Sequence, residues 1–172
     1  MPNNYPFVLI HGYNNFNDTF APAREILTGA GYECYSPHIG PFTGLWDRCC
    51  ELWAILNGGT VDYGKVHSEK YGHARYGRTY EKGLIEDWGK PGDHEKINFV
   101  GHSFGGPTVR TLIHLLAEGS EIERQGTDPD DLSDLFKGGK VKWVHSCTTL
   151  AGTHNGVTLP EQIQRAVKPL AF

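Results

Sequence analysis

The stretch INFVGHSFGGPTVRTLIHLL, residues 97–116, joins a short apolar run to a segment with helical periodicity. Residues 97–100 predict a buried strand. A helix is indicated after it, because apolar residues recur at i, i+3, i+4 and i+7: Val109, Leu112, Ile113 and Leu116. Gly119 follows at the place of a helix C-cap. Residues 101–105 fit the pattern G-x-S-x-G, so the turn between strand and helix contains Ser103.

Ser103 is the candidate nucleophile of this turn. The two glycines of the pattern let the strand and the helix approach closely while the turn exposes the serine hydroxyl. The N–H of Phe104 lies at the amino end of the helix, where backbone donors lack partners and the helix dipole favours negative charge. The alternative interpretation is that Ser103 only caps the helix.

A second turn supports the first interpretation. In FVLIHGYNN, residues 7–15, an apolar strand ends in a polar turn. This architecture places its other oxyanion donor in such a turn, so the N–H groups of Tyr13 and Phe104 are expected to converge on one oxygen. Each such donor commonly contributes about 3 kcal/mol in the transition state. His11 is expected to be structural.

The rest of the chain alternates strands with helices, which predicts an α/β fold with a mainly parallel sheet of about four strands and helices on both faces. The strands are expected at residues 7–10, 32–40, 97–100 and 141–150, and further helices at residues 21–27, 45–56 and 158–168. Residues 58–82, rich in Gly, Tyr, His and Arg, are expected to leave the sheet as an insertion. Residues 120–139 are polar and acidic and predict a solvated loop. The length of 172 residues fits one domain, over residues 1–172.

Composition excludes several classes of partner. The 16 Lys and Arg against 20 Asp and Glu give a net charge of −4 without a basic block, which argues against nucleic acid. No apolar run approaches the roughly 18 residues that span a bilayer, and the amino terminus lacks the pattern of a signal peptide. The four cysteines show neither zinc-ribbon spacing nor disulfide density, and Cys49 and Cys50 are expected to pack.

Five stretches together resemble the zinc-containing bacterial lipases of bacilli and staphylococci, a group that includes clostridial esterases. The resemblance runs from about residue 5 to residue 159, and the stretches are FVLIHGYNN, GPFTGLWDRCCELWAILNGGTVDYG, VHSEKYGHARYGRTY, INFVGHSFGGPTVRTLIHLL and CTTLAGTHNG. It implies an α/β-hydrolase fold that cleaves carboxylic esters, including lipids, through an acyl-enzyme on Ser103, with oxyanion donors at Tyr13 and Phe104. It also implies a secreted protein whose leader is absent from this chain, and a cytoplasmic location is the alternative.

The resemblance further implies a structural zinc ion bound by two aspartates and two histidines. Three of these positions match Asp47, His67 and His73, and the fourth, an aspartate, belongs to a part of the family chain beyond Phe172. A water molecule or an exogenous carboxylate would fill its place. The residues alone point to metal less clearly, because the two histidines do not form a helical i, i+4 pair. Solvated loop histidines and a first-turn acid on a helix are the alternatives.

A serine nucleophile needs a histidine base and an acid, which in this fold follow the serine in the chain. The resemblance places both beyond this chain, and His154 is the only internal substitute considered as base. The chain alone is therefore expected to be nearly inert, with a truncated sheet. The open edge of the fourth strand is expected to be covered by a complementary carboxyl-terminal half, a swapped copy or a crystal neighbour. The rival functions are an inert hydrolase half that serves as a binding or assembly module, and an acyltransferase.

Overall fold

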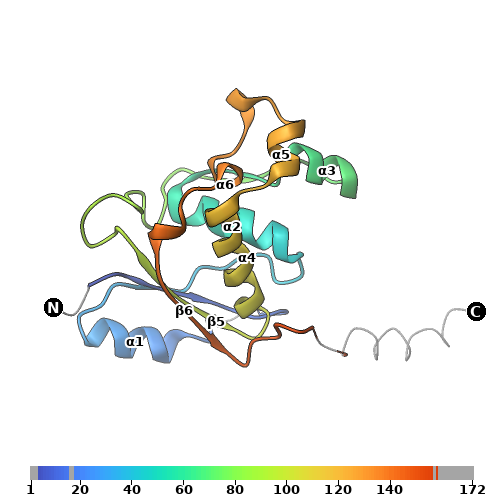
Figure 1. The fold of residues 1–172 in the computed structure, drawn as a ribbon. Coiled ribbons are helices and arrows are strands. Elements are labelled where there is room, and N and C mark those ends of the chain that lie inside the picture. Colours follow the sequence, from blue (N-terminus) through green and yellow to red (C-terminus); the bar gives the residue numbers. More distant parts are fainter. Residues whose placement is uncertain (1–3, 16–17, 157, 159–172) are drawn as a thin grey trace, which may run out of the picture.

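The structure is a computed structural model that describes residues 4–15, 18–156 and 158 (Figure 1). Its main sheet has four parallel strands in the order β2-β1-β5-β6, and a separate antiparallel pair is formed by β3 and β4. The elements in chain order are β1 (Phe7–Ile10), α1 (Ala21–Gly29), β2 (Cys34–Tyr35), α2 (Leu45–Asn57), β3 (Gly59–Asp62), α3 (Lys65–Tyr71), β4 (Tyr76–Tyr80), β5 (Ile97–His102), α4 (Gly105–Glu118), α5 (Glu121–Gly126), the 3-10 turn η1 (Pro129–Asp131), α6 (Asp134–Lys137), the 3-10 turn η2 (Val141–Trp143) and β6 (Val144–Leu150).

Helices cover both faces of the main sheet. Figure 1 shows α1 on one face and α2 with α4 on the other. The apolar stripes of α2 and α4 are buried together in the core: Cys49, Leu52, Leu56, Val109, Leu112 and Leu116. The predicted α/β class, with about four parallel strands and helices on both faces, is therefore confirmed. Burial raises the pKa of both the Cys49 and the Cys50 thiol, as expected for packing cysteines.

The register of the central strands brings two turns together. β1 pairs with β5 so that Ile10 lies opposite Gly101. Because the strands are parallel, their carboxyl ends lie at the same edge of the sheet. The turn after β1 and the turn after β5 are therefore neighbours, and this edge is where open α/β sheets bind their ligands.

Two predicted strands are shorter in the structure. Residues 141–143 form the 3-10 turn η2 rather than the start of β6, because the Trp143 N–H donates within the turn, to Lys140 O at 3.0 Å. The Trp143 ring stacks on that of Trp53 with centroids 6.2 Å apart. The strand expected over residues 32–40 is reduced to β2. The helix expected at residues 158–168 falls almost wholly outside the described residues.

Residues 58–82, the predicted insertion, are more ordered than their sequence pattern indicates. They form the β3–β4 pair with the helix α3 between the strands. In the part of the chain that the structure describes, no helix is long and apolar enough to cross a membrane.

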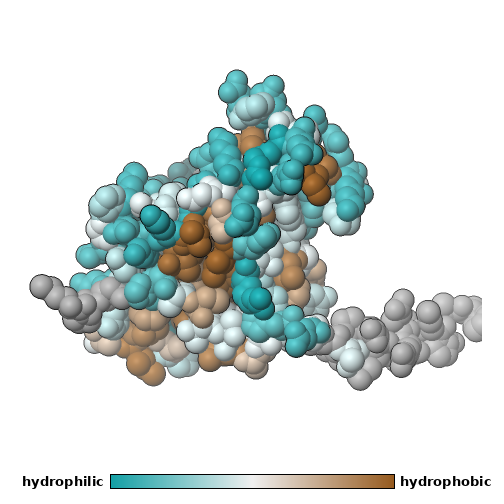
Figure 2. Space-filling view, viewed as in Figure 1, coloured by the Kyte–Doolittle hydropathy of each residue, from teal (hydrophilic) through white to brown (hydrophobic). Residues whose placement is uncertain are grey.

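The prediction of a solvated loop over residues 120–139 is wrong. The segment contains α5, η1 and α6, and its Leu135 and Phe136 side chains are buried in the core. Its outer surface is mostly hydrophilic, as the upper part of Figure 2 shows, which explains why the sequence reads as loop. The sequence did contain a helix signal, because serine is a preferred N-cap residue. In the structure Ser120 is the N-cap of α5, and its side chain accepts a hydrogen bond from the Glu123 N–H.

Candidate active site and metal centre

Ser103 lies in a strained turn between β5 and α4. Its φ of 53° is in the left-handed region, which costs a non-glycine residue on the order of 1 kcal/mol or more. Two hydrogen bonds hold the turn: the Ser103 N–H donates to Leu150 O at 2.9 Å, and the Gly106 N–H donates to Ser103 O at 3.0 Å. Gly105 permits the close approach of α4 to the sheet, because an added Cβ there would lie 2.1 Å from Ile10 O.

The turn after β1 lies directly against Ser103. A Cβ added to Gly12 would lie 2.9 Å from Ser103 Cβ, and the rings of Tyr13 and Phe104 meet edge to face at 6.2 Å. Within the part of the chain that the structure describes, neither the Tyr13 N–H nor the Phe104 N–H is hydrogen-bonded to a backbone carbonyl. The structure thus brings Ser103, Tyr13 and Phe104 together and leaves the two N–H donors available.

Arg48 of α2 donates a hydrogen bond to the turn after β1. The sequence analysis did not identify this residue. Its guanidinium is fully buried and donates to His11 O at 2.5 Å, to Gly40 O at 2.7 Å and to Thr108 Oγ1 at 3.0 Å. Burial lowers the pKa of Arg48 to about 10, so the group stays charged at neutral pH. An arginine beside two cysteines in an apolar helix was the available signal, because buried charges need partners.

His11 is structural, as expected. Its Nε2 accepts from the Ile39 N–H at 3.2 Å, and its Nδ1 lies 2.8 Å from Gly12 O. An Nε2 that accepts fixes the proton on Nδ1, which then donates to Gly12. Burial lowers the pKa of His11 and favours this neutral form.

His154, the histidine considered as an internal base, is hydrogen-bonded to a threonine of β6 and not to Ser103. His154 Nε2 lies 3.1 Å from Thr149 Oγ1, and no hydrogen bond joins His154 to Ser103. His114 lies on α4 and His145 in β6, neither at the turn. Among the described residues, no histidine is hydrogen-bonded to the Ser103 hydroxyl.

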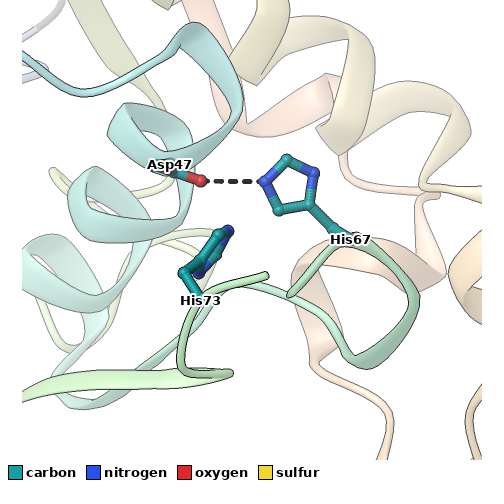
Figure 3. A group of neighbouring side chains, drawn as sticks. All are labelled: Asp47, His67 and His73. Atoms are coloured by element: carbon teal, nitrogen blue, oxygen red, sulfur yellow. Dashed lines mark hydrogen bonds and ion pairs between the residues drawn. The ribbon is translucent and has the colours of Figure 1, made fainter. Parts of the chain in front are cut away.

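Asp47, His67 and His73 converge at a second site (Figure 3). Asp47 comes from the first turn of α2, His67 from α3 and His73 from the residues that follow α3. Their ligand atoms lie within 4.8 Å of one another, and His67 Nε2 lies 3.0 Å from Asp47 Oδ1. Two imidazoles and one carboxylate are the ligand types that zinc prefers, so the donor set fits this metal.

The surroundings orient both imidazoles. His73 Nδ1 lies 2.9 Å from Ala74 O and donates to it when Nε2 faces the cluster as a lone pair. The Trp46 ring stacks on the His67 ring at 5.0 Å. Desolvation lowers the pKa of His67, although the Asp47 carboxylate opposes this shift, so the neutral ligand form is favoured.

Two further residues of the second site were missed. Glu123 of α5 reaches the first turn of α3, and Arg75 pairs with Asp62 at 2.9 Å and with Asp131. Both link the insertion to the segment that was interpreted as a solvated loop. No local sequence pattern indicates these contacts. Glu123 and Arg75 each bind partners that are more than 50 residues away in the chain or that lie on a different element.

Comparison with known proteins yields a consistent result. The family described as "Lipase-like, C-terminal domain" matches residues 3–167. A lipase of Staphylococcus epidermidis is 42% identical over 187 residues, which cover 99% of this chain and 27% of the relative. The chain therefore spans about a quarter of the length of this relative.

Solved structures agree with the sequence comparison. Lipase 1 from Pelosinus fermentans superposes with a TM-score of 0.85 at 47% identity, covering 95% of this chain and 45% of that one. The Staphylococcus hyicus lipase gives a TM-score of 0.84 at 40% identity, covering 98% and 46%. The resemblance noted from the motifs, and the fold class that it implied, are confirmed.

Proposed function

Because the chain belongs to the lipase-like C-terminal domain family, we propose that it is the nucleophile-bearing portion of a carboxylic ester hydrolase, a triacylglycerol lipase or carboxylesterase. The observation that carries the proposal is the left-handed turn at Ser103, set against two backbone N–H groups without backbone partners. A serine that only capped a helix would not need this strain. The N-cap position of α4, which begins at Gly105, is also occupied by Phe104 and not by Ser103.

The proposed reaction uses the groups that meet at the serine turn. Ser103 Oγ attacks the ester carbonyl carbon and passes its proton to a histidine base, and the carbonyl oxygen becomes an oxyanion that accepts from the N–H groups of Tyr13 and Phe104. Collapse of this intermediate breaks the bond to the alcohol oxygen, which takes the proton. Water then attacks the acyl-enzyme carbonyl and gives a proton to the histidine, the bond to Ser103 Oγ breaks, and Oγ takes that proton back as the carboxylic acid leaves. The histidine and its acid are assigned to no residue of this chain.

In the same proposal, Asp47, His67 and His73 hold a structural zinc ion. Bound there, zinc would link α2 to the α3 insertion and supply no step of the hydrolysis. A water molecule or an exogenous carboxylate completes the ligand set. The protein is further proposed to be secreted, to act on ester or lipid substrates, and to have the outer edge of β6 covered by a complementary carboxyl-terminal half or a swapped copy.

An active-site probe tests the serine assignment. The chain is treated with a fluorophosphonate, alone and with the remaining segment of a relative such as the S. hyicus lipase added, and the product is followed by intact mass and peptide mapping. Hydrolysis of a short-chain p-nitrophenyl ester is measured in parallel. Labelling at Ser103, absent in Ser103→Ala and retained in Ser133→Ala, is the expected result.

The same experiment separates the rival functions. Absence of labelling and of turnover under both conditions overturns the hydrolase proposal and favours a binding module. Turnover that yields a new ester when a short alcohol is added identifies an acyltransferase, because the acyl-enzyme then passes to the alcohol instead of water.

A further inference from the structure

Glu123 of α5 is a buried carboxylate that the proposed hydrolysis does not use. Its residue is only 1% exposed, and both of its carboxylate oxygens point at the first turn of α3. Oε1 accepts from the His67 N–H at 2.7 Å, and Oε2 accepts from the Val66 N–H at 3.1 Å. The Thr127 hydroxyl, 3.3 Å from Oε2, is a further donor.

This arrangement does not serve α5 itself. The N-cap of α5 is Ser120, whose hydroxyl already accepts from the Glu123 N–H at 3.3 Å. In the part of the chain that the structure describes, no Lys or Arg side chain forms an ion pair with Glu123. A buried carboxylate is costly unless hydrogen bonds compensate it, and here the compensating donors are chiefly backbone groups of the helix that carries His67.

The contact requires a close approach of two elements that lie far apart in the sequence. Gly64, just before α3, has a φ of +90°, and a Cβ added there would lie 2.5 Å from Glu123 Oε1. Only a residue without a side chain leaves room for the carboxylate against the backbone at this point. The chain therefore keeps both a glycine with positive φ and a buried carboxylate at the amino end of α3.

The remainder of the same segment supports the other side of the site. Asp131 forms an ion pair with Arg75, two residues beyond His73, and accepts from the Tyr76 hydroxyl at 3.1 Å. Phe136 stacks on Trp46 at 5.2 Å, and Trp46 in turn stacks on His67. Residues 120–137 thus contact the surroundings of both histidines while donating no ligand atom to the group of three.

We propose that Glu123 is a positioning residue of the metal site: by holding the backbone N–H of His67, it fixes the direction of this imidazole toward Asp47 and His73. The inference rests on the proposed zinc site and extends it to residues 120–137, which act as a brace. The brace keeps the three ligands assembled before the metal arrives, so its loss lowers metal affinity without removing a ligand.

The test measures Zn²⁺ affinity by competition with a chromophoric chelator, at a temperature where circular dichroism shows each metal-free variant folded. Glu123→Gln keeps the side-chain size but turns an N–H₂ group toward one of the two backbone donors. Partners of metal ligands typically change affinity by about 10- to 100-fold, so we expect a loss of at least tenfold. Glu121→Gln, on the same helix but exposed, is the matched control and should bind as the unaltered chain does.

A glycine pair repeats the test without changing charge, and it also serves if Glu123→Gln does not fold. Gly64→Ala pushes the carboxylate away and should lower Zn²⁺ affinity. Gly59→Ala imposes similar backbone strain, with a φ of +95°, but its Cβ would meet nothing within 4 Å, so affinity should be retained. A merely structural role would lower thermal stability in these variants and leave the Zn²⁺ dissociation constant unchanged, which overturns the positioning role alone. No Zn²⁺ binding by the unaltered chain overturns the metal site and the positioning role together.

Discussion

The serine turn and the metal centre are assembled in different ways. The first consists of two turns that follow neighbouring parallel strands, so the pairing of β1 with β5 brings Tyr13 beside Ser103 and Phe104. The second gathers candidate ligands from α2, α3 and the residues after α3, and residues of α5 and α6 contact their surroundings. A site at strand ends inherits its geometry from the sheet. A site in an insertion must be braced by contacts of its own.

The largest expected effect tests whether the two sites are independent of each other. A variant of the serine turn should lose phosphonate labelling and keep its affinity for Zn²⁺. Ser103→Ala should abolish phosphonate labelling, because the probe bonds to the serine Oγ, which alanine lacks. The dissociation constant for Zn²⁺ should stay within about a factor of two, since among the described residues no printed hydrogen bond or ring contact joins Asp47, His67 or His73 to the serine turn. Intact mass and chelator competition measure the two quantities, and a parallel loss of zinc affinity would show that the sites are not independent.

Removing the buried guanidinium of Arg48 should disturb the serine turn and spare the insertion. Arg48→Met leaves the carbonyl of His11 and the hydroxyl of Thr108 without their donor, and leaving a buried acceptor unsatisfied costs about 1 to 3 kcal/mol. Urea unfolding followed by tryptophan fluorescence gives the change in the free energy of unfolding. Arg110→Met, an exposed position on α4, is the control and should change it by less than about 0.5 kcal/mol.

Metal binding should stabilise the chain through the insertion. At a Zn²⁺ concentration of one hundred times the dissociation constant, the free energy of unfolding should rise by about 2.7 kcal/mol, and a chelator should reverse the gain. Asp47→Asn should remove most of the gain, whereas Asp93→Asn, an exposed aspartate in the loop before β5, should keep it. Equal stabilisation of both variants by zinc would contradict the assignment of Asp47.

The smallest expected effect is a pH-dependent change in the free energy of unfolding, caused by His94 at the opposite end of the sheet from Ser103. His94 Nδ1 lies 2.6 Å from Asp87 and its Nε2 lies 2.5 Å from Glu33, ahead of β5 and β2. Partial burial acts to lower the pKa of His94, but the hydrogen bonds to the two carboxylates outweigh it and the net shift is upward. The hydrogen bond from His94 lowers the pKa of Asp87.

The sign of the pH dependence follows from these directions. The histidine contributes fully below its ordinary pKa of 6.5 and loses the contribution as pH rises through the raised value. The aspartate contributes above its ordinary 3.8 and loses the contribution at lower pH. His94→Gln should therefore destabilise most near pH 5 and least above pH 8, by about 0.5 kcal/mol because the carboxylates are exposed. A difference that grows with pH in urea unfolding would contradict this. Labelling and zinc affinity should not change.

Local patterns predicted the elements that carry Ser103 and the fold class, because strand–turn–helix periodicity is a property of adjacent residues. The same reasoning failed for residues 120–139, where the apolar contribution is only two buried residues, Leu135 and Phe136, among charged ones. It also missed Arg48, whose partners lie on the turn after β1, on the loop before α2 and on α4. Hydrogen bonds between distant segments leave no periodic trace in a sequence.

The sequence by itself determined that a serine follows a buried strand between glycines, and through the family resemblance it indicated which acid and which two histidines to examine. Only the tertiary structure decided that Glu123 accepts from the His67 N–H, that Asp131 pairs with Arg75, and that Arg48 donates to the turn after β1. The physical reason is that a turn is specified by the steric needs of a few neighbouring residues. A buried charge, in contrast, is specified by donors and acceptors that meet only when the whole chain is packed.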